Sequence, residues 1–216
     1  MKNKTLITAI TLLLCFALWT LLILTIDVRP IGVNSTNIGF ATLNTWFHRL
    51  VGVHMSLYMI TDWLSLIPLS VCSLFAGIGL GQFIKRKSLK KVDKDIILLG
   101  IYYLLVIICF VGFEFMPINY RPILIEGVME VSYPSSTTLL VLSVMPTLIF
   151  QAKRRLTNGT FRNVVYIFTY FYSAFMVIGR LLSGVHWFTD IVGGILLSAG
   201  LFLMYMATVE IWENRK

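Results

Sequence analysis

Six long runs of apolar residues dominate this sequence, and a chain that carries them has few ways to fold outside a lipid bilayer. The runs cover residues 5–26, 63–84, 96–116, 136–150, 164–182 and 188–209. A helix needs about 20 mostly apolar residues to cross a hydrocarbon core of roughly 30 Å. The sequence therefore predicts an all-α, polytopic membrane protein with six transmembrane helices in a bundle.

The overall composition agrees with this prediction. Of the 216 residues, 57% are apolar and only 13% are charged, whereas a soluble domain carries about 25% charged residues. These values exclude an ordinary soluble enzyme and a disordered protein. Cys15, Cys72 and Cys109 lie inside apolar runs, which predicts buried thiols and not a disulfide framework or a metal site. We expect one membrane-embedded domain over residues 1–216, without a cofactor.

The first apolar run is expected to be a retained span, because it is too long for the core of a signal peptide and no A-x-A cleavage site follows it. The segment 33–58, before the second span, has a mixed character. Its larger side chains recur at helical spacing: Trp46, Phe47, Leu50, Val51 and His54. This pattern predicts a helix that lies at the membrane interface between the first two spans.

The net charge of +8 indicates how the chain is oriented in the membrane. Of the 18 Lys and Arg residues, 14 fall at the end of the bundle that carries the N-terminus: Lys2, Lys4, Lys85, Arg86, Lys87, Lys90, Lys91, Lys94, Lys153, Arg154, Arg155, Arg162, Arg215 and Lys216. Positive residues mark the cytoplasmic side of a membrane protein and can contact anionic lipids. We therefore expect both termini in the cytoplasm of a multi-pass plasma-membrane protein, bacterial in its compact plan. No contiguous basic face with aromatic platforms indicates a nucleic-acid partner.

Four arginines fall at the opposite, outer end: Arg29, Arg49, Arg121 and Arg180. Arg180 lies near the end of a span, and an ionisable residue at such depth suggests a function. His186 and Asp190 follow it, and on a helix these two positions share one face. The carboxylate could hold the imidazole in the tautomer that leaves Nε2 free as a nucleophile. A purely structural His–Asp pair is the alternative.

A second polar cluster surrounds the start of the fourth span. Arg121-Pro122 is followed by Pro134-Ser135-Ser136-Thr137, where proline and serine suit the first turn of a helix. This could be only a helix cap. A helix N-terminus also offers free N–H groups and a positive dipole end to an anion. Two guanidiniums and several hydroxyls at one end of the bundle favour phosphate, with Ser135, Ser136 and Thr137 as binding residues.

The order and spacing of these residues resemble the type 2 phosphatidic acid phosphatase superfamily, the integral-membrane lipid phosphate phosphatases related to vanadium haloperoxidases. That family carries the motifs K-x6-R-P, P-S-G-H and S-R-x5-H-x3-D. In this sequence the third motif is Gly179-Arg180, His186 and Asp190 at the same spacing. The first motif keeps Arg121-Pro122, and the second keeps Pro134-Ser135 with Ser136 in place of glycine.

The resemblance implies a role for each residue at the outer face of the membrane. His186 would attack phosphorus and form a phosphohistidine, and Asp190 would orient it. Arg121 and Arg180 would stabilise the transition state with Ser135 and the N–H groups near Ser136. The guanidiniums would take the place of a metal, and the substrate would be a membrane lipid phosphate.

Two departures from the family pattern concern the proton supply. The motif lysine is Glu114 in this chain, and the histidine that protonates the leaving group is Thr137. Loss of a general acid typically costs about 10²–10⁴-fold, and this loss matters least when the leaving group is itself a phosphate. A polyprenyl diphosphate is therefore the favoured substrate. Alternative acids at the outer end are Glu114, Glu126, Glu130, His48 and His54.

Other functions are compatible with parts of the pattern. A catalytically weak relative could bind or move lipid phosphates without hydrolysis, using the same arginines. A structural partner of cell-envelope machinery would leave the outer charges unexplained, and no inverted repeat indicates a transporter. The spacing of His186 and Asp190 favours the enzyme, because binding alone does not need a nucleophile.

Overall fold

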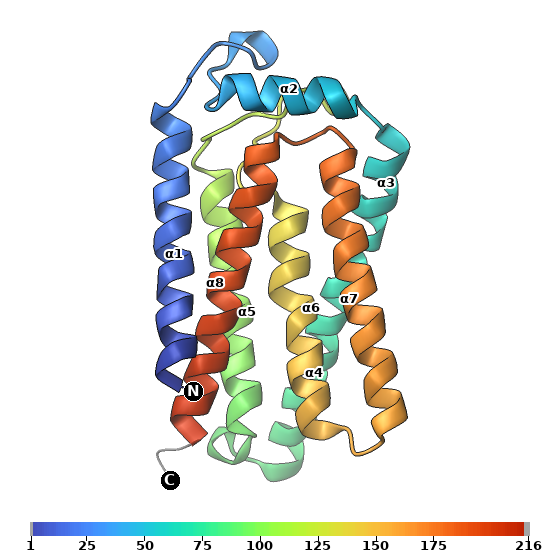
Figure 1. Ribbon diagram of the computed structural model, residues 1–216. Helices are drawn as coiled ribbons and strands as arrows, with labels where there is room; N and C mark the ends of the chain where they lie inside the picture. The colour runs from blue at the N-terminus through green and yellow to red at the C-terminus, as the bar shows by residue number, and fades with distance from the viewer. Residues whose placement is uncertain (1, 214–216) are drawn as a thin grey trace.

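Long helices that run side by side make up most of the chain, which the computed structural model describes from residue 2 to residue 213 (Figure 1). The α-helices are α1 (Lys2–Thr25), α2 (Ala41–Val51), α3 (Met55–Leu64), α4 (Leu66–Arg86), α5 (Lys94–Glu114), α6 (Ser136–Arg155), α7 (Gly159–Leu182) and α8 (Phe188–Glu213). Two short 3-10 helices, η1 (Val33–Ser35) and η2 (Leu89–Lys91), lie in the connections. Within residues 2–213, β structure is limited to isolated bridges.

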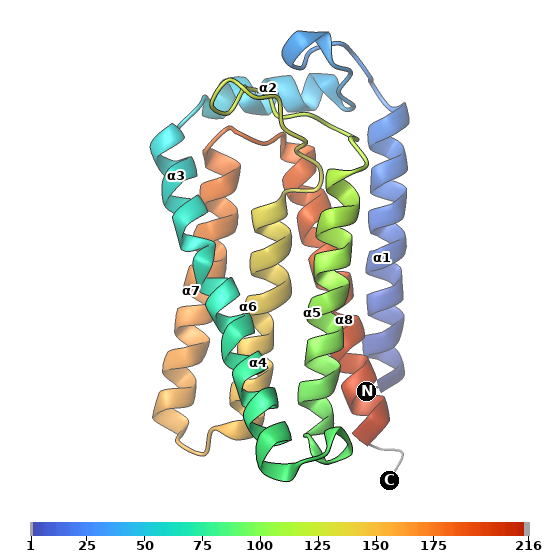
Figure 2. The same ribbon diagram turned by 180° about the vertical axis from the view of Figure 1, so that it is seen from behind.

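Six helical segments are long and apolar enough to span a membrane, as predicted. The helix α2 lies across one end of the bundle, roughly perpendicular to the others, and this confirms the interfacial helix (Figures 1 and 2). We refer to this end as the α2 end. The connections between α4 and α5 and between α6 and α7 lie at the opposite, basic end (Figure 2).

The second span differs from the prediction. It begins at Met55 and not at residue 63, because α3 and α4 together form one crossing, Met55–Arg86. The break between them follows from Pro68, whose nitrogen cannot donate to the carbonyl of Leu64. The Tyr172 hydroxyl of α7 donates to that carbonyl at 2.8 Å. A side chain thus satisfies a backbone group that lipid could not.

Three other ends were also predicted wrongly. The fourth span continues past residue 150 to Arg155, the fifth begins at Gly159, and the sixth ends at Glu213, the last described residue. Charged side chains extend α6 and α8, because Arg154 pairs with Glu213 and Arg155 pairs with Asp95 at the basic end. The interfacial helix is shorter than the expected pattern, since it ends at Val51, and His54 precedes α3.

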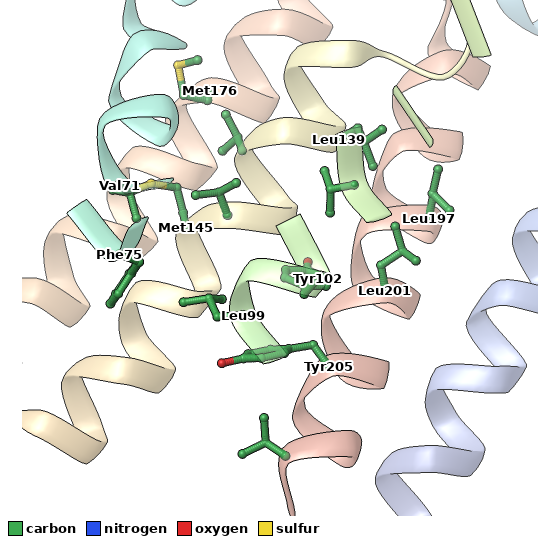
Figure 3. Close-up of a cluster of buried hydrophobic side chains, with 14 of the residues drawn as sticks. Val71, Phe75, Leu99, Tyr102, Leu139, Met145, Met176, Leu197, Leu201 and Tyr205 are labelled. Atoms are coloured by element: carbon green, nitrogen blue, oxygen red, sulfur yellow. The ribbon is translucent and has the colours of Figure 1, made fainter. Parts of the chain in front are cut away.

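The core between the helices combines apolar packing with polar links. Tyr102 of α5 and Tyr205 of α8 stack with ring centroids 5.0 Å apart, beside Leu99 and Leu201 (Figure 3). The Tyr102 hydroxyl donates to the carbonyl of Ser143 at 2.9 Å. Many large apolar side chains face outward instead, as expected for helices that are surrounded by lipid.

The helix α1 packs along α8 and reaches the α2 end. Leu13 lies against Gly200, where an added Cβ would approach the leucine to 2.8 Å. Further up, the Trp19 indole donates to the carbonyl of Thr189 at 3.1 Å, and Thr20 pairs with the Tyr133 hydroxyl at 2.7 Å. These bonds hold the beginning of α8 and the segment before α6 in place.

A network of ion pairs closes the basic end. Asp93 accepts hydrogen bonds from Arg86 at 2.7 Å, from Gln82 at 2.8 Å and from Arg155 at 3.1 Å. Arg155 also donates to Asp95 at 2.6 Å. The network joins α4, α5 and α6 outside the apolar part of the bundle.

The hydrogen bond from Arg86 lowers the pKa of Asp93 from 3.8 to about 2. The native carboxylate therefore holds its proton less tightly than the unfolded one, and its stabilisation is present above pH 4 and lost as the pH falls toward 2. We expect Asp93→Asn to lower the unfolding midpoint at pH 7 by about 2–4 °C, for a loss of about 1 kcal/mol. Thermal unfolding in detergent should show this difference shrinking between pH 4 and pH 2. A difference that is the same at both pH values would contradict the prediction.

Candidate active site

The residues predicted to act on phosphate come together at the α2 end of the bundle. They lie on the loop 115–135, on the beginnings of α6 and α8, at the end of α7, and on the turn 183–187 (Figures 1 and 2). The key side chains are buried: Arg121, Ser135, Arg180, His186 and Asp190.

Arg180 connects three helices. Its Nη2 donates to Asp62 Oδ1 at 2.8 Å and to Thr137 Oγ1 at 2.6 Å. Its Nη1 donates to the carbonyl of Tyr58 at 3.3 Å, and the guanidinium lies 4.6 Å from the centroid of the same tyrosine ring. The side chain is 2% exposed, and Nε makes no hydrogen bond. A buried cation therefore keeps one donor group for a further partner.

Arg121 also lies against Tyr58, with its guanidinium 5.6 Å from the centroid of that ring. Its Nε approaches Glu130 Oε2 to 2.9 Å, but the geometry is not that of a hydrogen bond. Its Nη1 also makes no hydrogen bond in the described structure. Both arginines thus have N–H groups that an anion could satisfy.

His186 lies on the short turn between α7 and α8. Gly184 in this turn has φ +68°, and a Cβ there would lie 1.9 Å from the Gly52 carbonyl oxygen, so the turn requires glycine. The His54 N–H donates to the carbonyl of Ser183 at 2.9 Å and ties the turn to the α2–α3 corner. The helix α8 begins at Phe188, so His186 precedes it and does not share a helical face with Asp190.

The imidazole nevertheless faces Asp190. The separation of His186 Nδ1 from Asp190 Oδ2 is 3.8 Å, and neither ring nitrogen makes a hydrogen bond. The carboxylate is held by Asn119 Nδ2 at 2.8 Å and by the Trp187 N–H at 3.0 Å. The second bond is a helix-capping contact. Asp190 therefore caps the start of α8 and also lies beside the His186 imidazole.

Burial lowers the pKa of His186 from 6.5 to about 4. Asp190 opposes this change, whereas the positive charges of Arg121 and Arg180 lower the pKa further. The imidazole is therefore neutral at physiological pH, with a lone pair available for nucleophilic attack. Both arginines are close enough to His186 for their charges to lower its pKa, so the three side chains belong to one site.

The beginning of α6 offers backbone donors to the same site. Ser135 precedes the helix, and no side chain caps it, so the first N–H groups of the helix stay available to a ligand. The Ser135 N–H donates to the Asp190 carbonyl at 3.1 Å, and its Oγ accepts from Thr138 at 3.0 Å. These bonds attach the start of α6 to the start of α8.

A cavity of about 470 Å³ extends from the two arginines into the bundle. Its polar end is lined by Asp62, Arg121, Ser136, Thr137 and Arg180. Its apolar walls come from α4, α5 and α6: Leu69, Val106, Ile107, Phe110, Val111, Leu139 and Leu140. The arrangement of these helices is visible in Figure 2. The cavity combines a site for an anion with space for an apolar chain.

Two of the alternative acids, Glu130 and Glu114, each have a contact or a neighbour in common with the site. Glu130 contacts Arg121, as described above. Glu114 is exposed at the end of α5 and lines a separate hollow of about 10 Å³, which it shares with Ser136. Within residues 2–213, no ion pair joins Glu114, the residue at the position of the motif lysine, to Arg121 or Arg180.

The other three candidates have different surroundings. Glu126 is exposed at the tip of the turn between Ile125 and Val128. His48 packs against Trp187 with ring centroids 5.6 Å apart. The His54 ring pairs with the carbonyl of Val51 at 2.9 Å.

The sequence analysis missed Tyr58 and Asp62 as residues of the site, and it gave no role to Asn119, which belongs to the polar cluster around Arg121. An ionisable residue inside a span is a signal for function, but the predicted start of the second span at residue 63 placed Asp62 outside the membrane. The contacts of Tyr58 and Asn119 join distant parts of the chain, and no local pattern indicates them. Among residues 2–213, no group of three His, Cys, Asp or Glu side chains is placed to hold a metal ion.

Comparison with known proteins agrees with the arrangement of the site. Residues 113–213, which include all three polar clusters, match the family model of the PAP2 superfamily. The predicted relation to the PAP2 superfamily is confirmed. The fold is similar to the crystal structure of the first transmembrane PAP2 type phosphatidylglycerolphosphate phosphatase from Bacillus subtilis, with a TM-score of 0.64 and 19% identity over 96% of this chain and 97% of that one. Among curated proteins, none matches this sequence.

One departure from the PAP2 motif pattern has a structural explanation. Gly179 replaces the serine that precedes Arg180, and a Cβ at this position would lie 2.8 Å from Thr61 Cγ2. The helices α7 and α3 therefore approach more closely here than a serine would allow.

The low pKa of His186 can be measured directly, because the chain has only three histidines. In NMR spectra of the ¹⁵N-histidine-labelled protein, we expect the signals of His186, assigned with His186→Gln, to titrate near pH 4. Desolvation by the surrounding bundle is the cause. Titration of His186 close to pH 6.5 would contradict the buried, positively surrounded imidazole.

Proposed function

We propose that this protein hydrolyses a membrane lipid phosphate or diphosphate through a phosphohistidine at His186, without a metal ion. The observation that carries the proposal is a buried, neutral imidazole without hydrogen-bond partners, whose pKa is lowered by the charges of two arginines. The same two arginines line the polar end of an apolar cavity. A site that served only as a structural ion-pair network would leave these donors and the imidazole without a purpose.

In the first step, the lone pair of His186 Nε2 forms a bond to phosphorus, and the bond from phosphorus to the leaving oxygen breaks. Arg121, Arg180 and the N–H groups at the start of α6 stabilise the charge on the phosphoryl oxygens. Asp190 stabilises the positive charge that develops on the imidazole. In the second step, water attacks phosphorus, the P–N bond breaks, and inorganic phosphate leaves with the imidazole restored to its neutral form.

The cavity supports a lipid as the substrate, because its apolar walls continue from the phosphate end. A polyprenyl diphosphate is the favoured substrate. Its leaving group is a lipid monophosphate, which departs without a proton, and Thr137 cannot supply one near neutral pH. The name of the structural neighbour, a phosphatidylglycerolphosphate phosphatase, is consistent with the broader class of lipid phosphates.

We further propose that the α2 end faces the outside of a bacterial plasma membrane and that both termini are cytoplasmic. The support is the separation between this site and the Lys and Arg residues of the basic end, which the positive-inside rule places in the cytoplasm.

Phosphate release in detergent tests the activity. With farnesyl diphosphate, geranylgeranyl diphosphate, farnesyl phosphate and phosphatidic acid, we expect turnover of at least one lipid by the wild type. His186→Ala should lower this turnover by about 10³-fold or more, because the nucleophile is lost. Rapid acid-free quenching with ³²P-labelled substrate should trap an acid-labile, base-stable phosphoprotein in the wild type alone.

Equal, slow release by the wild type and His186→Ala on every lipid would refute the enzyme. If the wild type then still bound these lipids in an Arg180-dependent manner, the alternative of a protein that binds or moves lipid phosphates would be supported.

The leaving-group argument makes a separate prediction. The ratio of kcat/KM for farnesyl diphosphate to that for farnesyl phosphate should be about tenfold or more, because only the monophosphate requires a proton on its leaving oxygen. Both substrates have the same apolar chain, so the comparison isolates the leaving group. A preference for the monophosphate would contradict the proposed substrate.

A further inference from the structure

Building on the proposed hydrolysis of lipid phosphates, we infer that Asp62 donates the proton to the leaving group when that group is an alcohol. Asp62 lies on α3, outside the three motifs and outside the region 113–213 that matches the family model. It would act in place of a histidine at the position of Thr137, and it would lessen without removing the preference for a diphosphate that the missing histidine causes.

The geometry that leads to this inference is a shared donor. A single nitrogen, Arg180 Nη2, donates to Thr137 Oγ1 at 2.6 Å and to Asp62 Oδ1 at 2.8 Å. The two oxygens cannot be farther apart than these two bonds laid end to end. The carboxyl group of Asp62 therefore reaches the space beside Thr137, where a longer acid side chain at that position would point.

Asp62 also lies on the surface that a substrate would touch. It lines the cavity together with Ser136, Thr137 and Arg180, and its side chain is 55% exposed. The charged and aromatic groups around it are Arg180 on α7, Tyr58 on its own helix and Arg121 on the loop 115–135. A carboxylate inside a span is costly and calls for a partner or a function.

The bound phosphate supplies the reason for the carboxyl group to become an acid. A phosphate that binds Arg180 competes with Asp62 for the same guanidinium, and two negative groups in one pocket favour a shared proton. As the P–O bond breaks, the proton passes from Asp62 to the leaving oxygen and an alcohol departs. In the second step, the Asp62 carboxylate takes a proton from the attacking water while the P–N bond breaks, which restores the acid.

Glu130 offers a matched comparison. It is also a carboxylate that contacts a phosphate-site arginine, Arg121, at 2.9 Å. It comes from the loop 115–135 instead of α3, and it does not share a donor with Thr137. Its removal should change the binding of phosphate but should not depend on the leaving group.

The test compares Asp62→Asn and Glu130→Gln on three substrates that differ in their leaving groups: farnesyl phosphate, farnesyl diphosphate and p-nitrophenyl phosphate. Asparagine keeps an acceptor for Arg180 but has no acidic proton. We expect Asp62→Asn to lower kcat for farnesyl phosphate by about 10²–10⁴-fold and kcat for the other two, whose leaving groups need no proton, by less than about fivefold. Glu130→Gln should change all three by a similar factor.

The retained diphosphate hydrolysis of Asp62→Asn would also show that the variant is folded. If Asp62→Asn does not fold, Asp62→Glu takes its place, because it keeps a carboxyl group. We then expect the ratio of farnesyl phosphate to farnesyl diphosphate turnover to stay within about fivefold of the wild type.

Several results would overturn the inference. An equal loss on all three substrates would show that Asp62 only positions Arg180, and unchanged hydrolysis of farnesyl phosphate would show that it has no part in the reaction. A ratio in Asp62→Glu that falls more than about tenfold would also contradict a role for the carboxyl group. In each case, turnover by the wild type would leave the proposed function intact, whereas a wild type without turnover would refute both.

Discussion

The burial of the Arg180 guanidinium is the interaction on which the site depends. A charge at this depth is expensive unless several groups compensate it, at a cost on the order of several kcal/mol per ion. The compensation comes from Asp62, Thr137 and Tyr58, so that α3, α6 and α7 must meet at one point. The position of these helices relative to one another thus follows from the partners that one arginine requires.

The same burial determines the chemistry of His186. Exclusion of water and the charges of Arg121 and Arg180 lower its pKa, so that the imidazole is neutral while a phosphate ester is anionic. In the proposed mechanism, the groups that hold the substrate are therefore also those that keep the nucleophile neutral. The price is a set of donors that have no partners within residues 2–213, among them Arg121 Nη1 and Arg180 Nε. Such unpaired groups are better satisfied by a transition state than by the empty site.

Much of the fold could be predicted from the sequence because lipid imposes simple rules. Length and hydropathy indicated six spans, and the spacing of the polar clusters indicated the relation to the PAP2 superfamily; both are confirmed. The ends of the spans were harder to predict. At Arg155 a helix continues because its charge reaches an ion pair, and at Pro68 two helices form one span because Tyr172 satisfies a free carbonyl.

The composition of the site was less predictable for a related reason. Arg121, Arg180, His186 and Asp190 have recognisable spacings, but Tyr58 and Asp62 enter the site only through contacts between distant helices. The prediction that His186 and Asp190 share one face of a helix was wrong, because α8 begins only at Phe188. The turn 183–187 follows from contacts of Gly184 with the backbone at Gly52, which no local pattern encodes.

The departures from the PAP2 motifs become understandable when they are considered together. Gly179 lacks the side chain of the motif serine, and its place is taken by the methyl group of Thr61. The next residue of α3 is Asp62, which this close approach brings to Arg180. Thr137, in place of the motif histidine, is short enough to bind the same Nη2 and leave room for a carboxyl group beside it. A serine at residue 179 would separate α3 from α7, and a histidine at residue 137 would compete for the space of Asp62. Under the inferred role of Asp62, these two departures from the motifs act together, because both make room for an acid from α3 at the place where the family pattern has one from α6.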